Sequence, residues 1–404
     1  MIMKIYFIKA SAGSDYSKYK AETGGPPQNI FAAAAATPKQ YQVEMTDETI
    51  GMQTNIESNA DLIVIFASTP DAYRAYELSQ IFSDRGKTVI LGGLHVMFNQ
   101  DEASEHGHAL IIGEIENYWE TLLEDFQLGK LKAIYQNSSP FDLGKLNPYP
   151  THLIAPKTYN YTWSVVVTRG CPFKCDFCLV HQFFNKFQLR PIENIVAELK
   201  QLKSLGITWV ELHSDNLTHN RDYALELFKA IAPLGLKFYG ETTVLIARDE
   251  ELLQAAKDAG VKALLLGIET PSVEALKAQK KGFVKPDKMK SYMEIIRKYE
   301  IEIWGDFLFG FDEHTPAIFQ ETIDFVKEIK VNKVIPHFMI PFPGSETFNK
   351  LDKENRILTK DWAQYDGSHA VYLPKNMSTA ELEEGVYWVW SKTASFMEKL
   401  RYSF

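Results

Sequence analysis

The sequence predicts an α/β protein made of two parallel-sheet units and a helical extension. In the first third of the chain, short apolar runs typical of buried strands alternate with segments of helical periodicity, the pattern of a parallel sheet covered by helices. A second series of strand and helix segments begins near residue 161, after a stretch rich in Ser, Pro, Gly and Asn. We therefore expect domains at residues 1–137 and 161–344, a linker at 138–160 and an extension at 345–404.

The first unit is predicted from four strand-like runs, at residues 4–8, 61–66, 88–91 and 110–112, and helices at 30–37 and 73–85. Two strands run into glycines, Gly92-Gly93 and Gly113. Glycine lets a backbone approach a bulky ligand at the carboxyl edge of a sheet, where open α/β folds bind ligands. Ordinary strand-to-helix turns explain the same glycines equally well.

The second unit is predicted from six strands at barrel-like spacing, separated by amphipathic helices such as 192–205 and 315–330. The expected strands are 163–167, 208–213, 237–242, 263–267, 301–309 and 333–339. In the extension, Ser378 and Glu381 form a capping box that opens an aromatic helix carrying Trp388, Trp390, Phe396 and Met397. This helix either packs against the barrel or covers its open side with some of its rings.

Composition limits the classes of protein. The chain has 404 residues, 45% of them apolar, enough for a sizeable core. A net charge of −9 argues against a broad nucleic-acid-binding surface, so no nucleic-acid partner is expected. No apolar run approaches the ~20 residues of a membrane span, and the N-terminus is too short and strand-like for a signal peptide. We expect a cytoplasmic protein, in a reducing compartment that keeps thiols free.

All three cysteines lie within one short stretch, at Cys171, Cys175 and Cys178. The spacing CxxxCxxC excludes a disulfide framework, because an even set of distant partners is missing. Three thiolates on a tight loop can hold one iron–sulfur cluster and leave one iron open for a substrate or cofactor. A structural zinc site completed by His181 and three unrelated buried cysteines are the alternatives.

The stretch TRGCPFKCDFC, which follows an apolar run, resembles the cluster loop of the radical S-adenosylmethionine (SAM) superfamily, including Phe177 before the last cysteine. The resemblance implies a partial (βα)6 barrel and a four-iron four-sulfur (4Fe-4S) cluster held by the three cysteines. The open iron would bind SAM. An external electron donor of flavodoxin or ferredoxin type would then drive its cleavage to a 5'-deoxyadenosyl radical.

Active groups of barrel enzymes lie at the carboxyl ends of strands. The resemblance assigns such positions to the SAM pocket, with Phe309 contributing through its strand backbone: Phe177, Ser214, Asp215, Asn216, Glu241, Thr242, Glu269 and Phe309. Ser272 is the expected cap of the helix after Glu269. Asp306 and His337 are candidate catalytic residues, since Asp306 alternates toward the cavity and His337 lies on the last strand.

The run from Asp61 to Asp125 is similar to the cobalamin-binding domain that precedes the barrel in many radical SAM enzymes. The resemblance implies a Rossmann-like domain that holds the corrin over an edge marked by Ser68, Thr69, Gly92, Gly93, Gly113 and Glu114. The loop after the first strand has no DxHxxG motif, so no histidine is placed there as a lower cobalt ligand.

The expected function is methylation of an unactivated carbon of a small-molecule, lipid or peptide substrate through the radical and methylcobalamin. With no further cysteine, the chain has neither thiolates for a second cluster nor a cysteine hydrogen donor. One rival is a radical SAM enzyme that performs cyclisation, rearrangement or redox chemistry without methyl transfer. A non-enzymatic rival is an iron–sulfur or zinc regulatory module. No pattern in the sequence selects a substrate.

Overall fold

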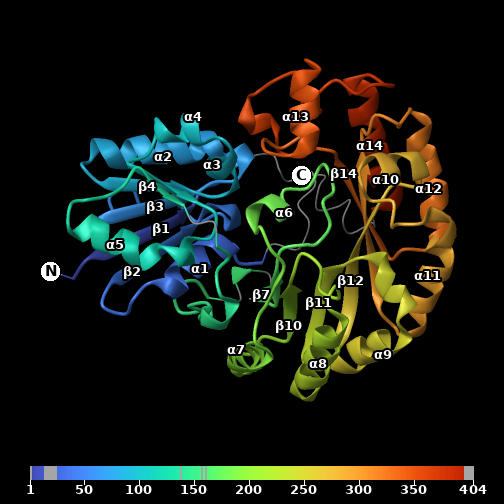
Figure 1. Ribbon diagram of the computed structural model, residues 1–404, viewed down its shortest axis with the longest axis horizontal. Coiled ribbons are helices and arrows are strands. Elements are labelled where there is room, and N and C mark those ends of the chain that lie inside the picture. Colours follow the sequence, from blue (N-terminus) through green and yellow to red (C-terminus); the bar gives the residue numbers. More distant parts are fainter. Residues whose placement is uncertain (1, 13–24, 137–138, 156–157, 160–161, 395–404) are drawn as a thin grey trace.

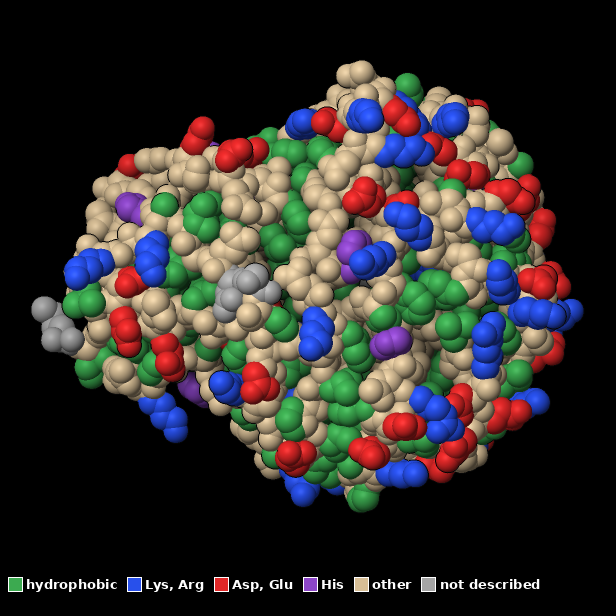
Figure 2. All heavy atoms as spheres, viewed as in Figure 1, with side chains coloured by type: hydrophobic (Ala, Val, Ile, Leu, Met, Phe, Trp, Pro, Cys, Tyr) green, Lys and Arg blue, Asp and Glu red, His purple; other side chains and the backbone are tan. Residues whose placement is uncertain are grey.

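The computed structural model describes residues 2–12, 25–136, 139–155, 158–159 and 162–394, and it confirms an α/β fold (Figure 1). An N-terminal unit, blue to cyan in the figure, lies beside a larger unit coloured green to orange. Figure 2 shows acidic and basic side chains mixed over the described residues of both units on the face in view. None of the described helices is both long and apolar enough to cross a bilayer.

The N-terminal unit is a six-stranded parallel sheet in the order β2-β1-β3-β4-β5-β6. Its strands are β1 (Lys4–Lys9), β2 (Gln42–Asp47), β3 (Leu62–Phe66), β4 (Thr88–Gly92), β5 (Ala109–Ile112) and β6 (Ile134–Gln136). Its helices are α1 (Gln28–Ala36), α2 (Ala72–Asp84), α3 (Leu94–Phe98), α4 (Gln100–Ser104) and α5 (Trp119–Gln127). Residues of β3 are buried along its whole length, as expected for a strand covered on both faces.

The sequence prediction misses the two edge strands, β2 and β6. β2 is half exposed and mixed in polarity, and β6 has only three residues, so neither forms a continuous apolar run. β2 lies on one side of β1, and the later strands β3 to β6 follow on its other side. The order of strands in the sheet therefore reverses direction between β1 and β3, and this point is defined only because β2 is present. Open α/β sheets bind ligands beside the carboxyl ends of strands at such a switch point.

The second unit is a six-stranded parallel sheet in the order β14-β13-β12-β11-β10-β7. The strands are β7 (Thr162–Val166), β10 (Trp209–His213), β11 (Lys237–Thr242), β12 (Val261–Glu269), β13 (Glu302–Phe309) and β14 (Lys333–Phe338). Its helices include α7 (Ile192–Ser204), α8 (Arg221–Ile231), α9 (Glu250–Ala259), α10 (Val273–Ala278), α11 (Pro286–Lys298) and α12 (Ala317–Ile329). β7 and β14 end the sheet unpaired with each other, which confirms the partial barrel.

The loop between β7 and α7 carries a small antiparallel pair, β8 (Thr168–Arg169) with β9 (Gln188–Leu189), and the short helix α6 (Val180–Phe183). In Figure 1, α6 lies between the two units. The cysteines are thus presented from the barrel toward the N-terminal sheet.

The extension contains α13 (Glu346–Lys353) and α14 (Thr379–Thr393), and the predicted capping box of Ser378 and Glu381 opens α14. α14 packs against α12 and β14, with Gly385 directly against the ring of Phe319. The described part of α14 therefore lies on the outside of the barrel and gives no support to a role in covering the cavity. Phe396 and Met397 lie outside the described residues.

Between α13 and α14 the chain returns to the N-terminal unit. The indole nitrogen of Trp362 donates to Glu102 at 2.9 Å, and the Trp362 ring lies edge-on to His95, with 5.4 Å between ring centres. Gly344 packs against the ring of Phe98. The segment from Gly344 to Trp362 therefore links the two units at a second place.

Candidate functional site

The cysteine loop, residues 170–179, starts with a tight turn at Gly170. Its φ of 85° is unfavourable for other residues, and a Cβ there would lie 2.6 Å from the carbonyl oxygen of Lys186. The Gly170 backbone N–H donates to the Asp215 carboxylate at 2.7 Å. The turn brings Cys171 next to the end of β10, where Asp215 follows the strand.

Cys175 is buried, whereas Cys171 and Cys178 are partly exposed. Burial raises the pKa of all three, to about 12 at Cys175. Neutral thiols are therefore favoured until a metal centre stabilises the thiolates. A set of three soft donors on one loop fits an iron–sulfur cluster with one open iron.

The zinc alternative with His181 calls for a tighter arrangement of ligands than a four-iron cluster does. Among the described residues, no group of three or more His, Cys, Asp or Glu side chains is arranged to hold a metal ion. A tetrahedral zinc with Zn–S bonds of about 2.3 Å gathers its ligands tightly around one atom. A four-iron cluster is larger, so its thiolates are held farther apart.

Four of the residues predicted for SAM binding come together at the ends of β10 and β11. The Ser214 hydroxyl is hydrogen-bonded to Thr168, beside the cysteine loop, and accepts the Asn216 backbone N–H at 3.1 Å. The Thr242 hydroxyl donates to Asn216 at 3.3 Å. Asn216 and Asp215 thus adjoin the cysteine loop from one side. These contacts hold the motif rigid, and its role toward SAM stays a prediction.

Glu269 is bound to a residue that the sequence prediction misses, Lys281. The two side chains form a buried ion pair. Gly267 makes room for them, since a Cβ there would lie 2.6 Å from the Lys281 nitrogen. A β-bulge between Gly267 and Glu269 re-aims the carboxylate, and Glu269 has a φ of 67°.

The pair lies directly behind the cysteine loop. The Lys281 nitrogen is 5.9 Å from the ring centre of Phe177. The second carboxylate oxygen of Glu269, Oε2, is buried without a hydrogen-bond partner. An unpaired buried oxygen of this kind fits a ligand hydroxyl or amino group. Ser272 caps α10, as predicted, and is not part of this site.

The inner face of the barrel carries further ionisable groups. Burial alone lowers the pKa of His213, but Glu211, 3.0 Å away, raises it to about 9. Burial among protein atoms, reinforced by Glu211, raises the pKa of Glu241 to about 7, although solvent reaches its side chain. Glu241 is therefore poised to gain or lose a proton near neutrality.

The two candidate catalytic residues lie together. Nε2 of His337 is 3.2 Å from the Asp306 carboxylate, and both side chains are partly exposed. Phe309 differs, because its side chain points out of the barrel and packs on Phe319, with 5.5 Å between ring centres. Only the backbone of Phe309 remains available for a ligand inside the barrel.

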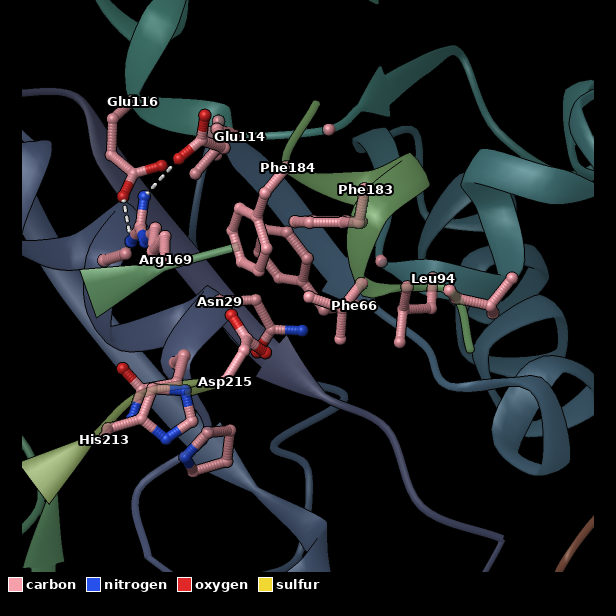
Figure 3. A pocket seen from close by; sticks show the side chains of 18 of the residues that line it. Asn29, Phe66, Leu94, Glu114, Glu116, Arg169, Phe183, Phe184, His213 and Asp215 are labelled. Carbon is pink, nitrogen blue, oxygen red and sulfur yellow. Dashed lines mark hydrogen bonds and ion pairs between the residues drawn. The ribbon is translucent and has the colours of Figure 1, made fainter. Parts of the chain in front are cut away.

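A cavity of about 590 Å³ separates the carboxyl edge of the N-terminal sheet from the cysteine loop (Figure 3). One wall comes from the ends of β1 and β3 and from α1, with Lys9, Phe66 and Asn29. The opposite wall comes from α6 and the barrel, with Phe183, Phe184, Phe177, His213 and Asp215. The cavity therefore lies at the switch point between β1 and β3 and is lined mostly by apolar groups.

The glycines predicted to mark a corrin edge have different surroundings. A Cβ at Gly92 would press on Phe66 and Ile111, so Gly92 is needed for close packing inside the sheet. A Cβ at Gly93 would lie 2.3 Å from the Ala67 carbonyl oxygen, so Gly93 is needed for the turn after β4. Gly113 has a φ of 84°, and a Cβ there would meet nothing within 4 Å. Gly93 and Gly113 line the cavity.

The polar residues of the same prediction already have protein partners. The Ser68 hydroxyl donates to Asp71, and Thr69 is buried in the following turn. Both carboxylate oxygens of Glu114 are engaged, Oε1 by Arg169 at 2.7 Å and Oε2 by the Phe141 backbone N–H at 2.9 Å. The side chains of Ser68 and Glu114 thus stabilise this edge of the protein itself.

Comparisons with known proteins agree with this architecture. Residues 165–326 match the radical SAM superfamily. The chain is 29% identical over 367 residues to bacteriochlorophyllide d C-12(1)-methyltransferase of Chlorobaculum tepidum, covering 89% of this chain and 80% of that protein.

Two solved structures share the fold at 14% identity. TsrM of Kitasatospora setae, a radical SAM methyltransferase solved with cobalamin and a [4Fe-4S] cluster bound, has a TM-score of 0.73, covering 88% of this chain and 78% of that one. OxsB, a cobalamin-dependent SAM radical enzyme, also has a TM-score of 0.73, covering 99% and 70%. The cysteine loop and most of the partial barrel lie within residues 165–326, and this segment is the part of the chain that belongs to the radical SAM superfamily.

Proposed function

We propose that the protein is a cobalamin-dependent radical SAM methyltransferase that methylates a carbon atom of a small-molecule, lipid or peptide substrate. The observation that carries this proposal is the cavity between the two units. Its walls combine the switch-point edge of an open α/β sheet with the loop that carries the three thiols. A methyl carrier held on the sheet would face the cluster and SAM across this cavity.

The residues of the cavity fit a corrin. A flat macrocycle needs apolar surface and backbone that can approach closely, and the aromatic wall and Gly113 provide both. No histidine is among the described residues that line the cavity from the N-terminal unit, and His95 is buried and hydrogen-bonded to Tyr76 at 3.0 Å. We therefore propose that this wall of the cavity would hold a corrin without an imidazole ligand to its cobalt.

The barrel residues have separate proposed roles. Asp215, Asn216 and Glu269 would hold the amino and ribose groups of SAM, and Glu241 would accept a further hydroxyl. The Asp306 and His337 pair would orient the substrate from the far side of the barrel. When bound, the cluster with SAM supplies a 5'-deoxyadenosyl radical, and the corrin supplies the methyl group. A flavodoxin or ferredoxin in the cytoplasm is the proposed electron source.

Gly113→Trp is expected to lower the affinity for hydroxocobalamin at least tenfold, because the indole would project into open space of the cavity. Gly51→Trp is the matched control. Gly51 has a similar φ of 81° and nothing within 4 Å of its Cβ, but it lies in a distant turn. Absorbance titration of the purified variants measures the affinities. An equal affinity for hydroxocobalamin in the two variants would show that the corrin does not bind in this cavity.

A further inference from the structure

Arg169, two residues before Cys171, joins the two units across the edge of the cavity (Figure 3). One terminal nitrogen lies 2.7 Å from Glu114 and the other lies 2.7 Å from Glu116. Glu114 follows β5, and Glu116 lies in the short turn after it. We call Arg169, Glu114 and Glu116 the arginine clamp.

The clamp is shielded from solvent. The exposed fractions of the three side chains are 8%, 5% and 3% in the order Arg169, Glu114, Glu116. The guanidinium also stacks near the ring of Phe184, 5.8 Å from its centre. Burying three charges is costly, and hydrophobic residues of similar size often serve stability equally well. Stability alone therefore does not account for an arginine clamp at this place.

The position of the clamp links two parts of the site. On one side, Arg169 lies in β8, and the next residue, Gly170, is held by Asp215, so the guanidinium is rigidly connected to the cysteine loop. On the other side, Glu114 and Glu116 lie one and three residues after Gly113 and line the same cavity. A shift of the guanidinium would move the cysteine loop relative to the edge of the N-terminal sheet.

The two units do not depend on the clamp to stay together. Trp362 binds Glu102 at a different place on the N-terminal unit, and Phe98 packs on Gly344. Loss of the clamp should therefore change the local spacing across the cavity and leave the units associated.

We infer that Arg169 is a positioning residue that sets the spacing between the cysteine loop and the edge of the N-terminal sheet, so that a methyl group can pass between SAM and the corrin. This inference rests on the proposed function. It predicts that breaking the clamp slows one reaction of SAM, methyl transfer to the corrin, and leaves the other, radical cleavage, unchanged. Radical cleavage needs only the barrel, whereas methyl transfer to the corrin needs both walls at the correct distance.

The test uses the variant R169M/E114Q/E116Q, which removes all three charges and leaves no unpaired buried ion. The single variant E116Q, which keeps the ion pair of Arg169 with Glu114, is the milder form. Arg74→Met is the control, because Arg74 also binds two carboxylates, Glu48 and Glu77, but within the N-terminal unit. S-Adenosylhomocysteine and 5'-deoxyadenosine are measured after anaerobic reaction with SAM, hydroxocobalamin and reductant.

The triple variant should keep its iron content. With hydroxocobalamin at a concentration that saturates each variant, its ratio of S-adenosylhomocysteine to 5'-deoxyadenosine should fall about 100-fold. E116Q should show a smaller fall in the same direction, and Arg74→Met should keep the wild-type ratio. A wild-type ratio in the triple variant, or an equal fall in the control, would overturn the inference.

Hydrogen–deuterium exchange without SAM is a second readout. Residues 113–118 and 168–171 should exchange faster in the triple variant, whereas β1 should not change. If the wild-type protein forms no S-adenosylhomocysteine while corrin is bound, the proposed function is wrong. The positioning role of Arg169 is then tested by the exchange data alone. Unchanged exchange in both segments would then contradict it.

Discussion

Alanine at Cys171, Cys175 or Cys178 is expected to abolish formation of 5'-deoxyadenosine and to remove the visible absorption of a four-iron cluster. The chain contains no other cysteine that could replace a lost ligand. Each thiol needs the metal centre to become a thiolate, since burial raises the pKa of all three. Iron and sulfide analysis of anaerobically reconstituted variants, with chromatography of the SAM products, measures both effects.

His181→Ala is the control for this series. His181 lies three residues after Cys178 and is the one side chain invoked for a zinc site. The cluster assignment predicts that His181→Ala retains iron and SAM cleavage. Stoichiometric zinc in the wild-type protein that is lost in this variant would contradict the assignment.

Lys281→Met should lower the free energy of unfolding by about 3–5 kcal/mol, because it leaves the buried carboxylate of Glu269 without its partner. Burial raises the pKa of Glu269, and Lys281 opposes that rise. Without the lysine, protonation of Glu269 becomes the way to relieve the buried charge. The destabilisation should therefore be largest at alkaline pH and shrink as the pH falls. Urea unfolding followed by tryptophan fluorescence, at pH 8 and pH 6, measures it.

The neighbouring Lys280 provides the matched control. Its side chain is 61% exposed and pairs with Asp176. Lys280→Met should cost less than about 1 kcal/mol, as surface ion pairs usually do. Equal destabilisation by the two substitutions would show that the buried pair with Glu269 has no special energetic role.

The parts of the site that the sequence predicted are those encoded locally. Three cysteines within a single loop identify a metal centre before any fold is known. Strands such as β3 are continuous apolar runs, so their existence and parallel arrangement follow from the sequence. The cap at Ser272 and the capping box at Ser378 are also local signals, and both are present.

Long-range partners could not be predicted in the same way. Arg169 meets Glu114 and Glu116 from 55 and 53 residues away, and Lys281 meets Glu269 across 12 residues and a bulge. Nothing in the local pattern distinguishes Lys281 from the exposed Lys280 beside it. The switch point also required β2, an edge strand without a clear apolar pattern.

The products formed from SAM show whether the protein transfers methyl groups through the corrin. The wild-type protein, with its cluster reconstituted and its bound cobalamin verified by the visible spectrum, is incubated anaerobically with SAM and a reductant. Both S-adenosylhomocysteine and 5'-deoxyadenosine should accumulate. Formation of 5'-deoxyadenosine alone, with cobalamin still bound, would contradict this expectation and favour radical chemistry without methyl transfer.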